Sequence, residues 1–119
     1  MKNYDIILAV PISKQRKKER GYNQSALIAR KIANKAGILY KENVIIKVKH
    51  NAKQSTLNMK ERAENVKNAY KVVDLETIHN KKVLLIDDIY TTGNTLKECS
   101  KVLKQAGAKM VNVLTIAKD

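Results

Sequence analysis

The fold of this chain is decided by the stretch Val83-Leu84-Leu85-Ile86-Asp87-Asp88-Ile89-Tyr90-Thr91-Thr92-Gly93-Asn94-Thr95. Its first residues, Val83 to Ile86, form an apolar run bounded by charge, which is typical of a strand buried on both faces of a parallel sheet. Two carboxylates then end the predicted strand. Apolar residues continue at helical spacing, at Leu96, Cys99, Val102, Leu103 and Ala106. The stretch therefore predicts a strand, a tight polar loop and the start of an amphipathic helix.

The polar loop has the composition of a phosphate site. Hydroxyls and backbone N–H groups from Thr91 to Thr95 would lie at the positive end of a helix, which favours a phosphate monoester. Gly93 lets the backbone approach the anion, because glycine has no Cβ and accepts positive φ. The structural alternative is that Thr92 or Asn94 serves only as the helix N-cap.

The two adjacent aspartates need groups that compensate their negative charge. Asp87 and Asp88 lie at the carboxyl end of the predicted strand, where ligands of open α/β sheets bind. Adjacent carboxylates repel each other, and burying a charge without a partner is costly. A sugar diol or a metal-bound ligand would supply the partners, whereas an N-cap leaves the pair unexplained.

All thirteen positions of residues 83–95 resemble the phosphoribosyl-diphosphate (PRPP) binding motif of type I phosphoribosyltransferases. The resemblance implies that Asp87 and Asp88 contact the ribose 2′ and 3′ hydroxyls. It also implies that the 5′-phosphate is wrapped by the residues of the loop, Thr91, Thr92, Gly93, Asn94 and Thr95. Competing phosphate motifs, the P-loop and the dinucleotide-binding glycine pattern, do not occur in the sequence.

Length and composition indicate one cytoplasmic domain spanning residues 1–119. No apolar run reaches the length needed to cross a membrane, and the first residues do not form a signal peptide. The single cysteine, Cys99, falls on the apolar stripe of a helix and is expected to be inert core. The net charge of +13 favours polyanions such as diphosphates, nucleic acid or acidic lipid, although genomic bias toward lysine is an alternative explanation.

Apolar runs elsewhere predict an α/β fold, a parallel five-stranded sheet flanked by helices. The other strands are expected at Asp5–Val10, Val44–Val48, Tyr70–Val73 and Met110–Ala117. Helices are expected from Asn23 or Gln24 to Ala36, from Asn58 to about Asn68, and from the motif to a stop at Gly107. A short helical turn is predicted at Leu75–His79, and Lys49–Leu57 is predicted to be a loop that could act as a lid.

A basic loop follows the first predicted strand. Lys14, Arg16 and Arg20 would stand at the mouth of the phosphate site, where charge-assisted hydrogen bonds could hold a diphosphate. The alternative is that these cations are only solvated.

The flanking segments are similar to the ComF-type competence proteins within the phosphoribosyltransferase superfamily. Pro11, Arg16, Arg20-Gly21-Tyr22-Asn23-Gln24 and Leu27-Ile28-Ala29-Arg30 carry the first part of this resemblance, and Lys47-Val48-Lys49, Gln54, Leu57, Arg62 and Asn65-Val66 carry the second. Two departures are evident. The paired Cys-x-x-Cys motifs of a zinc segment do not occur, nor does an obvious hood, and lysine at 47 or 49 replaces the family's usual arginine.

Two functions follow from these resemblances. The first is a transferase that moves ribose 5-phosphate from PRPP to an unidentified acceptor with Mg²⁺, or that uses the site for regulation. In it, Asp87 and Asp88 support the ribose, while Lys14, Arg16 and Arg20 receive the diphosphate. The second is a non-enzymatic binding module in competence-related DNA uptake, which contacts single-stranded DNA or other competence proteins. The sequence does not decide the acceptor or the oligomeric state.

Overall fold

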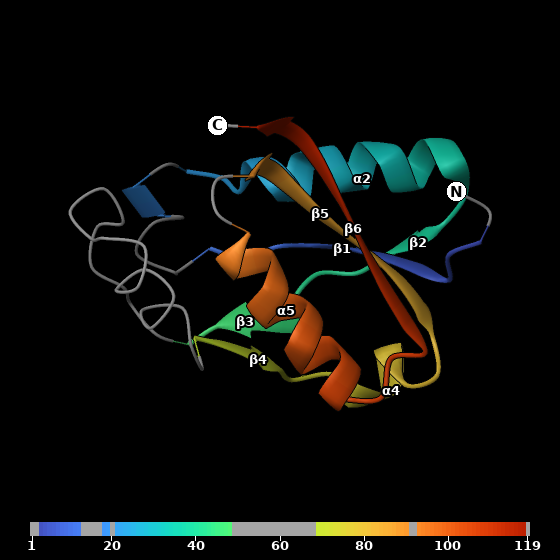
Figure 1. Ribbon diagram of the computed structural model, residues 1–119. Coiled ribbons are helices and arrows are strands. Elements are labelled where there is room, and N and C mark those ends of the chain that lie inside the picture. The colour runs from blue at the N-terminus through green and yellow to red at the C-terminus, as the bar shows by residue number, and fades with distance from the viewer. Residues whose placement is uncertain (1–2, 13–17, 20, 49–68, 91–92, 119) are drawn as a thin grey trace.

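The computed structural model describes residues 3–12, 18–19, 21–48, 69–90 and 93–118, and of residues 88–90 and 117–118 it describes the backbone alone. Its main sheet has four parallel strands in the order β2-β1-β5-β6 (Figure 1). The strands are β1 (Ile6–Ala9), β2 (Leu39–Tyr40), β5 (Lys82–Tyr90) and β6 (Met110–Lys118). β1 and β5 are interior strands, so the motif lies in the centre of the sheet.

Among the described residues, three further segments accompany the two longer helices. Helix α2 (Gln24–Ala36) and helix α5 (Asn94–Gln105) cover opposite faces of the sheet. A two-stranded antiparallel ribbon of β3 (Ile45–Lys47) and β4 (Tyr70–Val72) packs on the α5 side, together with the short helix α4 (Leu75–Ile78). The molecule is therefore a three-layer α/β structure.

Residues of the central strands alternate between the two layers, as the period of a strand requires. On the α5 side lies a core cluster that includes Ile6, Leu8, Val83, Leu85, Leu96, Cys99 and Leu103. On the α2 side lies a second cluster of Ile7, Leu84, Ile86, Ala29 and Ala33. Burial on both faces explains why the strand at the start of the motif is apolar at every position rather than at every second one.

The predicted helix boundaries at Ala36 and Gly107 are confirmed. Asn23 caps the N-terminus of α2, and Gly37 ends this helix in the left-handed conformation with φ 70°. After α5, Gly107 has φ 104°, and Ala108 donates a backbone hydrogen bond to the Leu103 carbonyl. This closing hydrogen bond and the positive φ have the form of a Schellman motif.

The α/β fold with a parallel sheet flanked by helices is confirmed, whereas the expected strand count and pairing need correction. The segments expected at Val44–Val48 and Tyr70–Val73 form β3 and β4, which pair with each other in antiparallel fashion instead of joining the parallel sheet. The fourth parallel strand is β2, whose two residues are too short to give a periodic signal.

The motif strand is also longer than predicted. It continues beyond Ile86 to Tyr90, because β6 supplies ladder partners for Asp87, Ile89 and Tyr90. The carboxylates therefore lie within the strand and do not end it. The predicted helix at 58–68 and loop at 49–57 lie outside the described residues.

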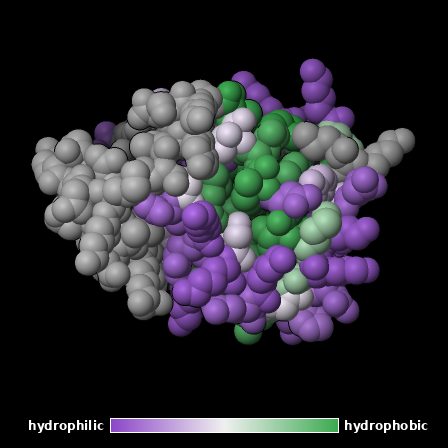
Figure 2. Space-filling view, viewed as in Figure 1, coloured by the Kyte–Doolittle hydropathy of each residue, from purple (hydrophilic) through white to green (hydrophobic). Residues whose placement is uncertain are grey.

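The hydropathy of the surface is uneven. Figure 2 shows hydrophilic side chains over the outward side of α5 and apolar ones along β6. On β6, the side chains of Val113 and Ile116 are exposed. In the part of the chain that the structure describes, no helix is long and apolar enough to cross a membrane.

Candidate functional site

The candidate site lies where the second half of β5 passes into α5. β1 pairs with β5 only as far as Ala9 opposite Ile86, so Asp87 is the first motif residue beyond the end of β1. On its other side β5 stays paired with β6, where Thr115 lies opposite Asp87. The main sheet thus opens beside Asp87 at the carboxyl ends of its strands, as expected for a ligand site in an α/β protein.

The Asp87 carboxylate is half-buried and accepts a hydrogen bond from a residue of helix α2. Ser25, in the first turn of α2, donates a hydrogen bond from its Oγ to Asp87 Oδ1 at 3.3 Å. Ser25 itself is only 3% exposed, so this hydroxyl is shielded from solvent. An ionised carboxylate can accept several hydrogen bonds on its two oxygens.

The N-terminus of α2 is fastened to the end of β1. Asn23 Oδ1 accepts hydrogen bonds from the backbone N–H groups of Ser25 at 3.0 Å and Ala26 at 3.4 Å. The amide Nδ2 of Asn23 donates to the Val10 carbonyl at 3.1 Å. The side chain of Asn23 thereby sets both the start of the helix and its position against the strand.

Gly93 forms the turn into α5. It is buried, has φ 81°, and stands at the N-cap position without a side-chain capping hydrogen bond. Asn94 and Thr95 follow as the first residues of the helix, and a backbone bond runs from the N–H of Lys97 to the Gly93 carbonyl at 2.9 Å. As at any helix start, the N–H groups of the first turn precede the first intrahelical bond, which makes this terminus suited to an anion.

This geometry excludes the alternative that Asn94 is the N-cap of the helix. The N-cap position is occupied by glycine, so Asn94 is the first residue inside α5 rather than its cap. Glycine adopts this left-handed conformation without strain and places no Cβ at the start of the helix.

Several predicted site residues lie outside the described residues. These are Lys14, Arg16, Arg20, Thr91 and Thr92. The backbone of Asp88 belongs to β5, while its side chain is not described. The structure places Asp87 in β5 and Gly93, Asn94 and Thr95 at the start of α5, and the site roles of all these residues stay predictions.

Cys99 lies beneath the site in the core. Its side chain is fully buried, and burial raises the pKa of the thiol well above its usual range, with smaller contributions from the charges of Asp87 and Glu98. A thiol that stays protonated is a poor nucleophile. The expected place of Cys99 in the core is confirmed.

Among the side chains that the structure describes, the Asp87 carboxylate is the candidate metal ligand of this site. Among the described residues, no group of three or more histidine, cysteine, aspartate or glutamate side chains could form a metal site. Mg²⁺ commonly binds phosphate oxygens and water together with one or two carboxylates. The half-buried carboxylate of Asp87 fits that limited role, and a bound Mg²⁺ would neutralise diphosphate charge.

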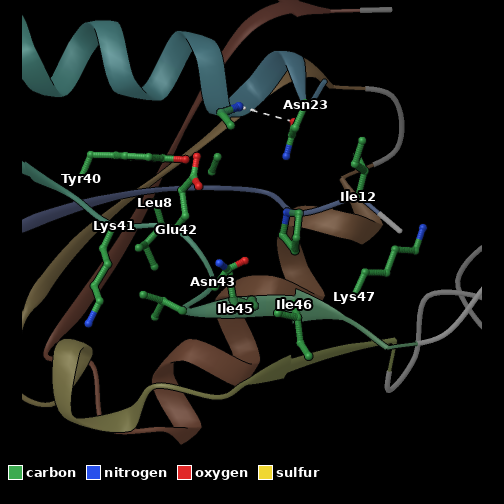
Figure 3. A pocket seen from close by; sticks show the side chains of 14 residues that line it. Leu8, Ile12, Asn23, Tyr40, Lys41, Glu42, Asn43, Ile45, Ile46 and Lys47 are labelled. Atoms are coloured by element: carbon green, nitrogen blue, oxygen red, sulfur yellow. Dashed lines mark hydrogen bonds between the residues drawn. The ribbon is translucent and has the colours of Figure 1, made fainter. Parts of the chain in front are cut away.

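A separate pocket of about 280 Å³ opens between α2 and the ribbon (Figure 3). Tyr40 and Glu42 stand at one end of the view, Ile12 and Lys47 toward the other. The lining residues are Leu8, Ala9, Pro11, Ile12, Asn23, Ala26 and the segment 40–47.

This pocket exists because β2 stops at Tyr40 and the chain leaves the edge of β1. Asn43 turns the chain with φ 61°, and Lys41 anchors the departing segment by a 2.6 Å ion pair with Asp74. None of the motif residues whose side chains the structure describes lines the pocket. Asn23 connects the two places, since it lines the pocket while capping the helix that carries Ser25.

Two residues of the site were not predicted from the sequence. Asn23 was named as a possible helix start and within the ComF-type resemblance, without a role in the site, and no pattern singled out Ser25. An asparagine directly before an apolar helical pattern does signal a cap. A contact between residues 25 and 87 has no comparable local signal.

Comparison with known proteins agrees with this geometry. Residues 22–119 match the phosphoribosyl transferase domain family. The chain is 35% identical over 115 residues to competence protein F of Haemophilus influenzae, covering 96% of this chain and 50% of that protein. It is 31% identical to the DNA utilization protein YhgH of Salmonella typhi, covering 96% and 49%. It is 32% identical to competence protein ComFC of Streptococcus pneumoniae, covering 98% and 49%.

Solved structures share the fold at low sequence identity. The glutamine PRPP amidotransferase of B. subtilis superposes with a TM-score of 0.63 at 21% identity, over 95% of this chain and 22% of the other. The adenine phosphoribosyltransferase of Thermoanaerobacter pseudethanolicus superposes with a TM-score of 0.60 at 14% identity, over 97% and 58%. The chain spans about half the length of the curated relatives it matches. It belongs to the phosphoribosyl transferase domain family, as a type I phosphoribosyltransferase-like protein of the ComF type.

Proposed function

We propose that this domain binds PRPP at the β5–α5 junction and transfers its ribose 5-phosphate to an acceptor, or uses the bound ligand for regulation. The observation that supports the proposal is that β5 extends at Asp87 beyond the end of β1 and is followed in the chain by α5, which starts at a left-handed glycine. Asp87 supplies an acceptor for a ribose hydroxyl, and the N–H groups after Gly93 supply donors for the 5′-phosphate.

The remaining roles follow from the motif. Asp88 joins Asp87 on the ribose diol, and Thr91 and Thr92 join the phosphate contacts of Asn94 and Thr95. Lys14, Arg16 and Arg20 receive the departing diphosphate, with Mg²⁺ neutralising part of its charge. We place this activity in the cytoplasm, in keeping with a single, buried cysteine.

Calorimetric titration with PRPP and Mg²⁺ tests the binding step. Gly93→Ala adds a Cβ at φ 81°, which strains the turn and crowds the anion, so we expect PRPP affinity to fall at least tenfold. Gly37→Ala is the matched control, because Gly37 also has positive φ and lies at the far end of α2, where an added Cβ would meet nothing within 4 Å. The control should keep the affinity of the parent protein.

Equal PRPP affinity in the Gly93→Ala variant and the parent would remove the phosphate assignment. The transfer step needs its own assay, namely release of diphosphate from PRPP in a screen of nucleobases and amines. Release with none of them, in a protein that binds PRPP, would favour regulation over transfer.

A second candidate function is binding of single-stranded DNA, which is supported by a row of exposed lysines on α5. Lys97, Lys101 and Lys104 are exposed on this helix at spacings that place them along one side. The chain carries a net charge of +13, and relatives carry names that refer to DNA utilization and competence. A row of cations can follow a phosphate backbone without reading its sequence.

Fluorescence anisotropy with labelled single-stranded DNA tests this candidate. Changing Lys97, Lys101 and Lys104 together to glutamine should weaken binding and reduce its salt dependence. Changing Arg30, Lys31 and Lys35 on α2 removes the same number of charges from the other face and should weaken binding less. Equal losses in both variants would indicate general charge attraction instead of a site on α5.

A further inference from the structure

We infer that Ser25 is a positioning residue for the ribose-binding carboxylate, and that the capped N-terminus of α2 is built to hold Asp87 for its ligand. The inference rests on the proposed function and adds to it a residue from outside the motif. In this proposal Ser25 contacts Asp87 and is not assigned a contact with the ligand. It acts through the hydrogen bond from its Oγ to Asp87 Oδ1.

The first step of the argument is geometric. Asp87 extends beyond the end of β1 and has a ladder partner only on the β6 side. A carboxylate side chain has several staggered rotamers available in principle, and its hydrogen bonds select among them. The 3.3 Å bond from Ser25 ties one oxygen to α2 and restricts rotation of the group.

The second step concerns the rigidity of the donor. Ser25 is 3% exposed, and its backbone N–H is bound by Asn23 Oδ1 at 3.0 Å. Asn23 is in turn bound to the Val10 carbonyl at the end of β1. A donor on a capped helix end that is itself fastened to the sheet moves little, so it can hold its partner in one orientation.

The third step is energetic. Burying a hydroxyl is unfavourable unless it is hydrogen-bonded, and the bond to Asp87, at 3.3 Å, is longer than the strongest charge-assisted bonds and has ordinary strength. A hydrogen bond that orients a ligand-binding group raises affinity by reducing the ordering cost of binding. Loss of one such bond typically costs about tenfold in an equilibrium constant.

The test compares two ligands that share only the phosphate. Isothermal calorimetry measures the binding of ribose 5-phosphate, which has the sugar hydroxyls, and of inorganic phosphate, which has none. We expect Ser25→Ala to weaken ribose 5-phosphate about tenfold and to leave inorganic phosphate within about twofold of the parent protein. Ser100→Ala, the same change on α5 outside the Ser25–Asp87 contact, should leave both affinities unchanged.

A double-mutant cycle identifies the path of the effect. In an Asp87→Ala background, Ser25→Ala should cost less than about twofold, because the acceptor that the Ser25 hydroxyl orients is no longer present. Equal losses for both ligands would mean that Ser25 only maintains the local structure, which overturns the inference. Unchanged ribose 5-phosphate affinity in Ser25→Ala also overturns it while leaving the proposed function intact. If the parent protein binds phosphate but does not prefer ribose 5-phosphate, the proposed function fails and the inference fails with it.

Discussion

At the scale of single residues, the environment of a side chain decides how it ionises. Tyr40 shows this at the edge of the pocket that lies between α2 and the ribbon. Burial, and to a smaller degree the nearby Glu42 carboxylate, raise the pKa of its phenol to about 12, while Arg30 acts in the opposite direction. The phenol is therefore kept as a neutral hydrogen-bonding group over the whole physiological range.

This raised pKa predicts an alkaline loss of stability. An unfolded tyrosine gives up its proton near pH 10, whereas folded Tyr40 retains it to about pH 12. Between these values the folded state binds more protons than the unfolded state, so the free energy of unfolding falls as the pH rises from 10 to 12. We expect Tyr40→Phe to reduce this fall by about 1 kcal/mol. The value is smaller than the full pKa shift would give, because Tyr40 is only half-buried and solvent screens its charge.

Urea unfolding at stepped alkaline pH measures the effect. Tyr22→Phe changes an exposed tyrosine and serves as the control, which should keep the alkaline fall of the parent protein. If Tyr40→Phe also kept the full alkaline fall, the environment assigned to Tyr40 would be wrong.

At the scale of elements, helix α2 links local sequence to the site. Its N-terminus has no acidic residue in the first turn, so the side chain of Asn23 is the main capping group. The same side chain fastens the helix to β1 through the Val10 carbonyl. The start of α2 therefore depends on one residue for both its capping and its placement beside Asp87.

Removing the cap should lower the stability of the whole domain. We expect Asn23→Ala to reduce the free energy of unfolding by about 1 to 2 kcal/mol, because two backbone N–H groups and one carbonyl lose their partner. Asn34→Ala, an exposed change within the same helix, should leave stability unchanged or slightly raised, since alanine favours helix.

Chemical denaturation followed by circular dichroism compares the two asparagine variants. Similar midpoints for both would show that Asn23 does not act as the cap. A loss confined to Asn23→Ala would support the capping role from which the positioning of Ser25 follows.

At the scale of the whole molecule, charge opposes folding. The chain has 24 lysine and arginine residues against 11 aspartate and glutamate, for a net charge of +13. Among the described residues, the ion pairs of Arg30 with Glu42 and of Lys41 with Asp74 are largely solvent-exposed, and such pairs add little stability. Repulsion among like charges therefore weakens the compact state.

Salt should consequently stabilise the domain. The screening length of the solution shortens from about 30 Å at 0.01 M to about 10 Å at 0.1 M salt. At the lower salt concentration, charges on distant parts of the molecule therefore still repel each other. We expect the melting temperature to rise by a few degrees over this range and to level off at higher salt. Scanning calorimetry at stepped sodium chloride measures it.

The Lys31→Gln, Lys35→Gln double variant removes two positive charges and should show a smaller rise. A melting temperature that is independent of salt in the parent protein would contradict net repulsion as a destabilising factor.

Much of the architecture follows from local pattern. The all-apolar run at Val83–Ile86 predicted a central strand, the spacing of Leu96, Cys99 and Leu103 predicted the buried stripe of α5, and Gly37 predicted the end of α2. These inferences succeeded because each feature depends on the residue types at a few neighbouring positions. This holds for burial on both faces of a strand, for the helical period and for a left-handed backbone at the end of a helix.

The pairing of the ribbon and the length of β5 could not be obtained this way. A short apolar segment such as Ile45–Lys47 is compatible with either sheet, and only its partner decides between them. Likewise, β5 extends through Asp87 because β6 lies beside it with matching length. Hydrogen-bond partners from distant segments outweighed the local preference of aspartate to leave a strand.

By itself, the sequence determined the α/β class, the core stripes of the motif strand and helix, and the family to which the motif belongs. Only the tertiary structure decided that Ser25, which lies 62 positions before Asp87, donates to its carboxylate. The physical reason is that periodicity and turn chemistry act over one or two turns of chain. A contact between layers instead depends on how the capped start of α2 packs beyond the end of β1.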